Sequence, residues 1–441
     1  MPTNEILAIL MLVSFFGLLL AGFPVALTLA VSGFVFGWLG FGSLLFNLLP
    51  NRIFGVVTSY TLLAIPLFVF MGVMLEKSRL AEDLMEVVGH LAGDLRGGLG
   101  VGIILVGIVM GATTGIVGAT VVTLGLLTLP TLLRRGYDKG LACGVICASG
   151  TLGQIIPPSL ILILLADIMN DSVGTFFAAA VFPGLLLALL YMGYILLLGV
   201  LRPNMVPPVP KAERNAMPKR ELWGKLLRVA LPPLGLVLAV LGSIIAGIAA
   251  PTEAASMGAL GSIVVTAIGR RFNLSMLKAT IFDTTKITAQ MMFILICAQI
   301  FAIAFRGLQG EKLVEDMFHA LPGGINADIW FMLLIIFVLG FFIEWIEICY
   351  IAVPLFLPIF QAAGADLVWI AALICLMLQT SFLTPPFGWA LFYLRGVTPP
   401  EVTTADIYRG VVPFILLQVV AVGIVFLVPS LATWLPKSIG W

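Results

Sequence analysis

Apolar segments of similar length follow one another along most of this chain. A helix needs about twenty apolar residues to cross a bilayer. On that measure we expect spans near residues 4–22, 24–46, 53–76, 138–168, 175–201, 226–249, 254–269, 281–305, 366–394 and 409–434. The pattern therefore predicts an all-α polytopic membrane protein with about ten spanning helices.

Two further stretches, 98–133 and 324–362, fit poorly as single spans. Each has glycine or polar residues at its middle and polar residues at both ends. Two half-length helices that meet at a tip, a re-entrant hairpin, explain each stretch better than one long helix. Two tilted full spans are the alternative. We expect two re-entrant helical hairpins in addition to the spans.

The composition agrees with a chain embedded in a lipid bilayer. Of its 441 residues, 61% are hydrophobic and 10% are charged, and the mean hydropathy is +1.16. A soluble domain has about 25% charged residues. The net charge of +1 gives no reason to expect a nucleic-acid partner. Both histidines lie outside the expected spans, so a His-centred catalytic or metal site is not expected.

The distribution of lysine and arginine predicts the orientation of the spans. With the N-terminus outside, 19 of the 23 Lys and Arg residues fall in cytoplasmic segments. Only Arg52, Arg306, Lys312 and Lys437 then fall on the outer side. The reverse orientation would invert this bias. We therefore expect a multi-pass protein with its N-terminus outside.

One proline pattern occurs twice, and it organises the chain. Pro130 precedes the pair Pro157-Pro158 by the same interval that separates Pro358 from Pro385-Pro386. Each pair lies in an apolar stretch, and small polar residues precede it. Because the two copies have the same spacing, we expect an internal repeat with an offset of 228 residues.

The repeat extends beyond the prolines. The same offset maps the expected span at 53–76 onto the span at 281–305. Five crossings separate the starts of these spans, and an odd number inverts the second copy. We expect two inverted-topology repeats, an N-terminal half at 1–201 and a C-terminal half at 226–441, joined by a cytoplasmic linker at 202–225.

The two proline pairs break their helices at membrane depth. A proline cannot donate a hydrogen bond to the carbonyl four residues before it. We therefore expect the carbonyls of Gly153, Gln154, Ser381 and Phe382 to lose their helical partners. Because lipid cannot hydrogen-bond such groups, a break of this kind normally lines a cavity. Paired breaks in corresponding positions of two halves indicate the central site of a transporter.

Each break offers two kinds of binding group. Freed carbonyls beside hydroxyls provide oxygen ligands that suit a hard cation such as Na⁺. The half-helix after the break begins with unpaired N–H groups and the positive end of the helix dipole, which suit a carboxylate. We therefore expect a cation site and an anion site side by side.

The hairpin tips supply the facing wall of this site. The first tip, Gly111 to Thr120, has three glycines that relax a turn and three threonines that can bind a cation. Close helix packing is the alternative reason for such spacing. The second tip has two acids, Glu344 and Glu347, three residues apart and expected on one helical face. Acids at membrane depth are functional by default, and these would bind a cation, carry a proton or pair with a base.

These motifs resemble the DctM-like large membrane subunits of tripartite ATP-independent periplasmic (TRAP) transporters. The resemblance covers essentially the whole chain. Its most specific stretches are GATTG at 111–115, LPTLLRRGYD at 129–138, SGTLGQIIPPS at 149–159, APTEAA at 250–255 and LTPPFG at 383–388.

The resemblance implies a non-enzymatic, Na⁺-coupled importer of an organic acid (a carboxylate) in a bacterial or archaeal cytoplasmic membrane. It implies an elevator mechanism, in which a mobile domain with both hairpins and both broken helices slides against a scaffold. It also implies two protein partners, a small four-helix membrane subunit (DctQ-like) and a periplasmic substrate-binding protein (DctP-like). Na⁺ is the coupling ion, and no organic cofactor is expected.

By resemblance, Na⁺ sites fall where each hairpin tip meets its broken helix, and the substrate lies between them. The candidate sodium-binding residues are Gly111, Thr113, Thr114, Gly115, Ser149, Gly153, Gln154, Gly340, Glu344, Gln379, Ser381 and Thr384. The candidate substrate-binding residues are Thr120, Thr151, Pro157, Pro158, Ser159, Glu347, Pro385, Pro386 and Gly388.

The second tip departs from the family pattern. Many relatives have an aspartate or smaller polar residues where this chain has Glu344-Trp-Ile-Glu347. The departure leaves the substrate and the coupling stoichiometry open, with a 2-oxo acid or a dicarboxylate as the simplest expectation.

Two other functions stay open at this point. One is a stand-alone Na⁺-coupled dicarboxylate or anion carrier of related fold, without a soluble partner. The other is an intramembrane transferase. The transferase is disfavoured because it would need a nucleophile or an acid–base cluster near one membrane interface. The polar groups of this chain lie at the midplane and occur twice.

Overall fold

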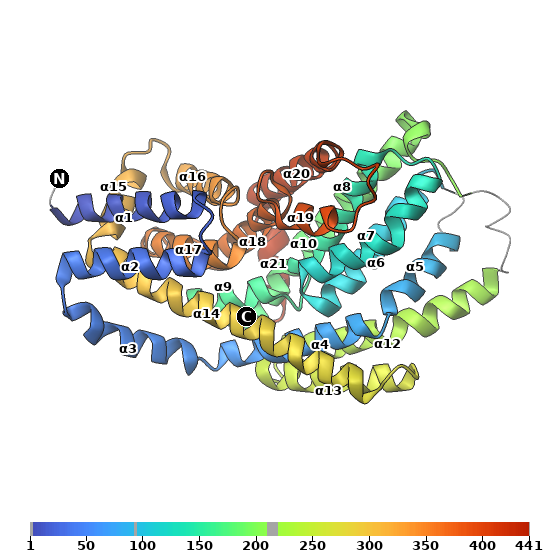
Figure 1. Cartoon of the computed structure of the whole chain (residues 1–441), viewed down its shortest axis with the longest axis horizontal. Coiled ribbons are helices and arrows are strands. Elements are labelled where there is room, and N and C mark those ends of the chain that lie inside the picture. Colours follow the sequence, from blue (N-terminus) through green and yellow to red (C-terminus); the bar gives the residue numbers. More distant parts are fainter. Residues whose placement is uncertain (1–2, 92–94, 210–218, 441) are drawn as a thin grey trace.

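The computed structural model describes residues 3–91, 95–209 and 219–440, which are helical and contain no β-strand (Figure 1). The first half comprises α1 (Thr3–Leu20), α2 (Val25–Phe41), α3 (Leu44–Val57), η1 (Thr61–Leu63), α4 (Ala64–Lys77), α5 (Leu80–Leu91), α6 (Gly98–Thr114), α7 (Val117–Arg134), α8 (Lys139–Thr151), η2 (Leu152–Gln154), α9 (Leu160–Met169) and α10 (Val173–Leu201).

A short turn, η3 (Pro203–Met205), leads toward the second half. That half comprises α12 (Lys219–Ile245), α13 (Pro251–Ile268), α14 (Leu274–Gly307), α15 (Gly310–His319), α16 (Gly324–Leu339), α17 (Trp345–Ala362), α18 (Leu367–Leu383), α19 (Trp389–Arg395), α20 (Thr404–Leu427) and α21 (Ser430–Ser438). Part of the predicted linker, residues 210–218, lies outside the described residues.

The two halves repeat the same order of elements, as the proline pattern predicts. The hairpin α6–α7 corresponds to α16–α17, the broken helix α8–α9 to α18–α19, and α10 to α20. The halves also pack reciprocally. Helix α2 contacts α14 while α13 contacts α4, and α8 contacts α20 while α18 contacts α10. Such exchanged contacts are expected of two repeats related by a two-fold axis.

Both predicted hairpins are confirmed, and local backbone geometry explains their tips. Gly115 ends α6 with a φ of 60°, in the left-handed region where a side chain is strained. Ile116 is extended, and α7 begins at the next residue. In the second hairpin α16 ends before Gly340, and the extended residue Glu344 precedes α17.

Both predicted breaks are also confirmed. Helix α8 passes into η2 and ends before Pro157-Pro158, and α9 begins at Leu160. Helix α18 ends at Leu383, and α19 begins at Trp389, beyond Pro385-Pro386. The peptide bond within each proline pair is cis.

The number of full spans is smaller than the predicted ten. Among the described residues, six helices are individually long and apolar enough to cross a membrane, or up to seven if the bent pair α3 and η1–α4 forms one span. Two of the six, α7 and α17, are hairpin arms. The ten predicted spans also included short apolar helices such as α1 and α2, and the two broken helices.

Two predicted boundaries are wrong in the same region. The stretches 24–46 and 53–76 were expected to be single spans, but α2 ends at Phe41 and α3 occupies 44–57. The axes on either side of the break after α3 differ by 51°. The hydroxyl of Thr58 donates to the carbonyl of Phe54 (2.7 Å) at this point, and Pro66 lies in the first turn of α4, where a proline is tolerated.

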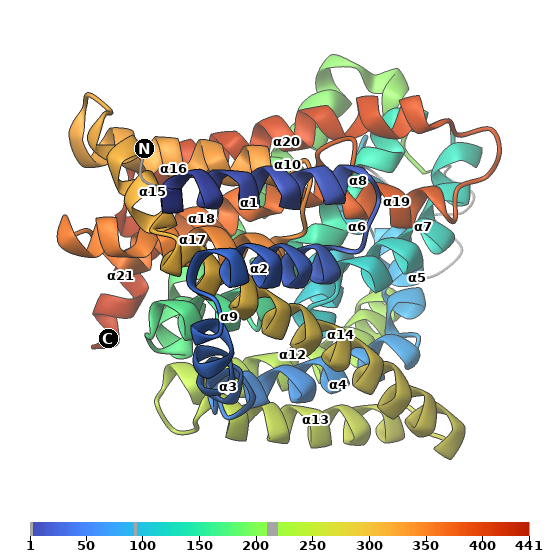
Figure 2. The ribbon, with the colours of Figure 1, turned by 60° about the vertical axis from the view of Figure 1, so that its left-hand side comes forward.

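The helices form two groups. Helices α4, α12 and α13 lie along one side of the molecule, and α8 and α20 lie on the opposite side (Figures 1 and 2). Helix α20 contacts α10 and α18, which belong to this second group. Within the first group α13 contacts both α4 and α12. Within the second group the hairpin helices α6 and α16 contact α8 and α18 respectively. Helices α14 and α4 provide contacts between the groups, to α17 and α6.

Glycines allow the closest packing within the second group. A Cβ atom at Gly144 would lie 2.1 Å from the carbonyl oxygen of Gly410, and one at Gly410 would lie 1.8 Å from the carbonyl oxygen of Gly140. Helices α8 and α20 therefore touch through their backbones, as small residues permit in membranes.

We expect Gly144→Ala to lower the melting temperature of the purified protein by several degrees. The added methyl group must push α8 away from α20, and overpacking of this kind costs about 1–3 kcal/mol. Gly193→Ala in α10 is the matched control, because no atom lies within 4 Å of its added Cβ. Equal melting temperatures for the two variants would contradict the packing described here.

Candidate functional site

The first hairpin tip rests directly on the first broken helix. A Cβ at Gly111 would lie 2.3 Å from the Cα of Gly153, and a Cβ at Gly153 would lie 2.1 Å from the Cα of Gly111. One turn earlier, a Cβ at Gly107 would lie 2.7 Å from the carbonyl oxygen of Ser149. Because no side chain separates the two segments, their backbone carbonyls and hydroxyls share one small volume.

A buried amide fixes the tip to the break. The side-chain N–H of Gln154 donates to the carbonyl of Gly115, where the hairpin turns. The hydroxyls of Thr114 and Thr120 lie 3.0 Å apart across the same turn. The carbonyl of Gln154 was expected to be free, but it accepts a hydrogen bond from the hydroxyl of Ser159. The cause is local, since Ser159 follows the proline pair and folds back over it.

Three hydroxyls at the first junction keep their oxygen lone pairs available. Thr113 donates to the carbonyl of Met110 (2.8 Å), Ser149 to that of Val145 (2.6 Å), and Thr151 to that of Ala148 (2.9 Å). A hydroxyl that donates its only proton to the backbone still presents an acceptor oxygen. The junction therefore offers oxygen ligands of the type that hard cations prefer.

The second hairpin makes the equivalent contact in the second half. A Cβ at Gly340 would lie 2.7 Å from the Cβ of Ser381. These two residues follow Gly111 and Gly153 by 229 and 228 positions, so the same junction is built twice. Ser381 donates to the carbonyl of Leu378 (2.7 Å), and Thr384 donates to that of Thr380.

A second buried amide lies in α18. Gln379 is fully buried, and neither its side-chain nitrogen nor its side-chain oxygen has a hydrogen-bond partner among the described residues. Its backbone carbonyl accepts from the side chain of Gln418 in α20 (3.2 Å). A buried amide without partners is uncommon and indicates a place for water, an ion or a ligand.

The two acids of the second tip occupy different environments. Glu344 is the extended residue before α17 and is half-buried, whereas Glu347 lies in the first turn and is 1% exposed. Glu344 therefore directly precedes the helix on which both acids were expected. No described lysine, arginine or histidine forms an ion pair with either acid. One carboxylate oxygen of Glu347 has no described partner.

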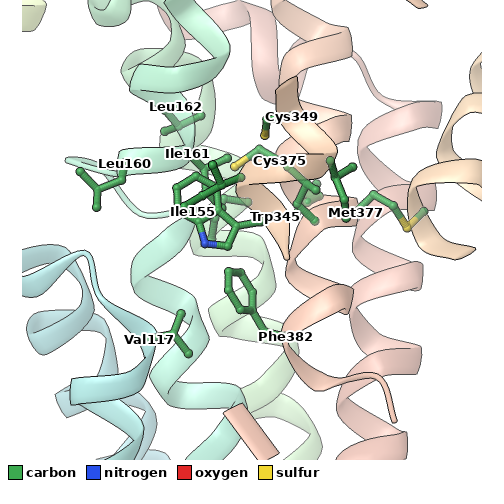
Figure 3. Packing of buried hydrophobic residues seen from close by; sticks show 14 of the residues in the cluster. Val117, Ile155, Leu160, Ile161, Leu162, Trp345, Cys349, Cys375, Met377 and Phe382 are labelled. Atoms are coloured by element: carbon green, nitrogen blue, oxygen red, sulfur yellow. The ribbon is translucent and has the colours of Figure 1, made fainter. Parts of the chain in front are cut away.

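Both junctions border one central cleft with a volume of about 140 Å³. Apolar side chains from four segments gather there, Val117 after the first tip, Leu160 after the first break, Trp345 at the second tip and Phe382 before the second break (Figure 3). Helix α14 closes the cleft from the other helix group.

The cleft includes three of the residues predicted to bind sodium, Gly115, Gln154 and Glu344. The other predicted sodium-binding residues lie at the two junctions behind it. None of the residues predicted to bind substrate lines this cleft, although all of them are described: Thr120, Thr151, Pro157, Pro158, Ser159, Glu347, Pro385, Pro386 and Gly388. Their role in substrate binding stays a prediction.

Two features of the site were not predicted from the sequence. Ile287, Gln290 and Met291 of α14 line the cleft, and the polar residue Gln290 within an expected span was the available signal. The second feature is a bridge at one end of α9. Asp167 accepts from the hydroxyls of Ser59 (2.7 Å) and Tyr350 (3.3 Å), and no sequence pattern links these three positions.

The half-helices after the breaks connect the repeats. Helix α9 packs against α17 of the second hairpin, and α19 packs against α7 of the first. A Cβ at Gly118 would lie 2.7 Å from the ring of Tyr393. Each break is thus completed by the hairpin of the other repeat, so the site requires both halves of the chain.

Comparison with known proteins agrees with this geometry. Residues 12–431 match the family described as "Tripartite ATP-independent periplasmic transporter, DctM component". The C4-dicarboxylate TRAP transporter large permease protein DctM of Pseudomonas aeruginosa is 30% identical over 400 residues, covering 89% of this chain and 90% of that protein. The ectoine TRAP transporter large permease protein TeaC of Halomonas elongata is 28% identical, covering 97% and 98%.

A solved structure supports the fold. The YdaH transporter of Alcanivorax borkumensis, whose crystal structure reveals an unusual topology, aligns with a TM-score of 0.59 over 97% of this chain and 99% of that chain, at 16% identity. Because a family match over nearly the whole sequence coincides with paired hairpins and paired broken helices, the chain belongs to the DctM family, the large permease component of tripartite ATP-independent periplasmic transporters.

Proposed function

We propose that this chain is the large permease subunit of a Na⁺-coupled secondary transporter that imports a small organic acid. The observation that carries the proposal is the tip-to-break junction, built twice around one cleft, at Gly111 and Gly153 and again at Gly340 and Ser381. Paired discontinuous helices of this kind hold the ions and substrates of many secondary transporters.

Sodium is the proposed coupling ion because the junctions present oxygen atoms. The first junction has the hydroxyl oxygens of Thr113 and Ser149 beside the backbone of Gly111 and Gly153. Within the described residues no group of three or more His, Cys, Asp or Glu side chains gathers as a transition-metal site would require. A hard monovalent cation suits neutral oxygen ligands of this kind.

A carboxylate is the proposed substrate. The amino-terminal ends of α7 and α9 reach the cleft at Val117 and Leu160, and the positive end of a helix dipole attracts anions. The relatives are named for C4-dicarboxylate and ectoine, so the family name alone leaves the choice of carboxylate open.

Two protein partners complete the proposed transporter, a periplasmic binding protein that delivers the substrate and a small four-helix membrane subunit. The outer face of α13 has room for such a subunit in the membrane, because Met257, Leu260, Val264 and Ile268 are exposed. We place the complex in a bacterial or archaeal cytoplasmic membrane, with the N-terminus of this chain outside.

An elevator motion is the proposed mechanism. The group with both hairpins and both broken helices would slide past the group that contains α4, α12 and α13. The bridge from Ser59, between α3 and η1, to Asp167 of α9 joins the two groups in this state (2.7 Å). It would have to open during transport.

The most direct test of the proposal is uptake by proteoliposomes that contain this chain and its small membrane subunit. We expect uptake only when an inward Na⁺ gradient and the substrate-loaded binding protein are both present. Uptake of the free substrate at the same rate without the binding protein would instead support a stand-alone carrier. Uptake that is unaffected when K⁺ replaces Na⁺ would contradict sodium coupling.

Thr113→Ala and Ser149→Ala should each raise the Na⁺ concentration required for half-maximal uptake by about tenfold, because each removes one of the few oxygen ligands. Thr128→Ala is the matched control, since this buried threonine of the same hairpin also donates to a backbone carbonyl, that of Leu124 (2.6 Å), but lies away from the tip. An unchanged Na⁺ requirement in both test variants would argue against the first site.

A reversible cross-link tests the proposed motion. In a background without the native cysteines, Ser59→Cys with Asp167→Cys should react with a short cleavable bis-thiol reagent and lose most uptake. Cleavage should restore uptake, and each single-cysteine variant should stay active after treatment. Full activity of the cross-linked double variant would contradict sliding between the two helix groups.

A further inference from the structure

The charge of the central cleft restricts the chemical class of the substrate more narrowly than membership of the family does. Among the described residues that line the cleft, Glu344 is the only one with a formal charge. Its other polar side chains include Gln154, Gln290 and Tyr393. A ligand with only negative charges would face this carboxylate without a cationic side chain in the lining to compensate, and like charges brought together out of water repel strongly.

One residue of the cleft wall, Gln154, also has a buried acceptor that has no donor. The side-chain nitrogen of Gln154 donates to the carbonyl of Gly115. A carbonyl only accepts, so this contact fixes the amide with its oxygen on the other side. Gln154 is 2% exposed, and that oxygen has no hydrogen-bond partner among the described residues. A buried acceptor left unpaired costs about 1–3 kcal/mol, which a ligand N–H group would recover.

Aromatic rings form another part of the wall. Trp345 borders the cleft, and so do Trp389 and Tyr393, whose ring centroids are 6.3 Å apart. The faces of such rings attract organic cations. Na⁺ prefers oxygen ligands, and oxygen-rich sites for it lie at the junctions. The combination of a carboxylate, an unpaired amide oxygen and aromatic rings therefore suits a cationic nitrogen that carries hydrogen atoms.

We infer that the substrate of this chain is a small zwitterion, with its cationic nitrogen held by Glu344 and Gln154 among the aromatic rings. This assignment replaces the sodium-binding role predicted for these two residues. Its carboxylate then faces the amino-terminal end of α7 at Val117 and Gly118, which line the same cleft. This inference rests on the proposed function, because it adds a positive group to the carboxylate proposed there.

Thermal stabilisation by matched compounds tests the inference on the purified full chain in nanodiscs with saturating Na⁺. The probes are proline with cyclopentanecarboxylate and 4-aminobutyrate with butyrate, pairs that differ in the nitrogen. Succinate serves as the dianion. We expect the nitrogen-bearing member of at least one pair to raise the melting temperature by about 2 °C or more over its partner and over succinate, because a ligand stabilises the state that binds it.

Glu344→Gln should abolish this difference while retaining the effect of Na⁺ alone. Glu315→Gln, an exposed acid of α15, is the matched control and should behave as the original chain does. The inference would be overturned if the two members of every pair raised the melting temperature equally, or if neither member of any pair raised it. Stronger stabilisation by succinate would also overturn it. Loss of Na⁺ stabilisation in Glu344→Gln would also overturn it, since Glu344 would then hold the ion. Na⁺-driven uptake of a purely anionic substrate would leave the transporter proposal intact and exclude the zwitterion.

Discussion

Glycine brings each hairpin tip into close contact with its broken helix, and the rest of the site depends on this contact. At Gly111 and Gly153 even one methyl group would lie closer than 2.5 Å to the opposing backbone. A tip that turns inside the membrane exposes carbonyl and N–H groups that lipid cannot satisfy. Contact with a second interrupted helix places those groups inside the protein. The same unsatisfied groups are the ones suited to bind an ion.

Inverted repetition explains why there are two such junctions and one cleft. Helix α9 packs on the hairpin of the second repeat and α19 on the hairpin of the first, so neither repeat completes a site alone. The two junctions differ chemically. The first tip presents the hydroxyls of Thr113 and Thr114, whereas the second is followed by the acids Glu344 and Glu347. Two similar repeats thus enclose a cleft whose two sides carry different polar side chains, and this difference determines which ligand fits.

Much of this frame was predictable from the sequence because membrane burial constrains composition strongly. The lengths of the apolar stretches predicted most helices, and the duplicated proline pairs predicted both breaks. The offset of 228 residues identified equivalent positions in the two halves. The bend after α3 was missed because Thr58 and Ser59 interrupt an apolar stretch too briefly to change its average hydropathy. The contribution of α14 to the cleft was not predictable because the hydropathy of one span does not show which other helices it meets.

The chemistry of individual residues was less predictable. Helical spacing placed Glu344 and Glu347 on one face, but Glu344 precedes the helix and is extended. The carbonyl of Gln154 was expected to be free, yet Ser159 donates to it. The bridge from Asp167 to Ser59 and Tyr350 joins residues 108 and 183 positions apart. Contacts between residues so far apart in the sequence depend on how whole helices pack against one another, and no local sequence pattern predicts that packing.

Hydrogen exchange of the backbone amides, measured by mass spectrometry in Na⁺ and in K⁺, tests the central claim most directly. If ions bind where the tips meet the breaks, Na⁺ should slow exchange in residues 111–118, 149–159, 340–347 and 379–388. Exchange in α12 and α13 should stay unchanged. Equal exchange in the two salts at both junctions, or protection confined to α12 and α13, would contradict the account.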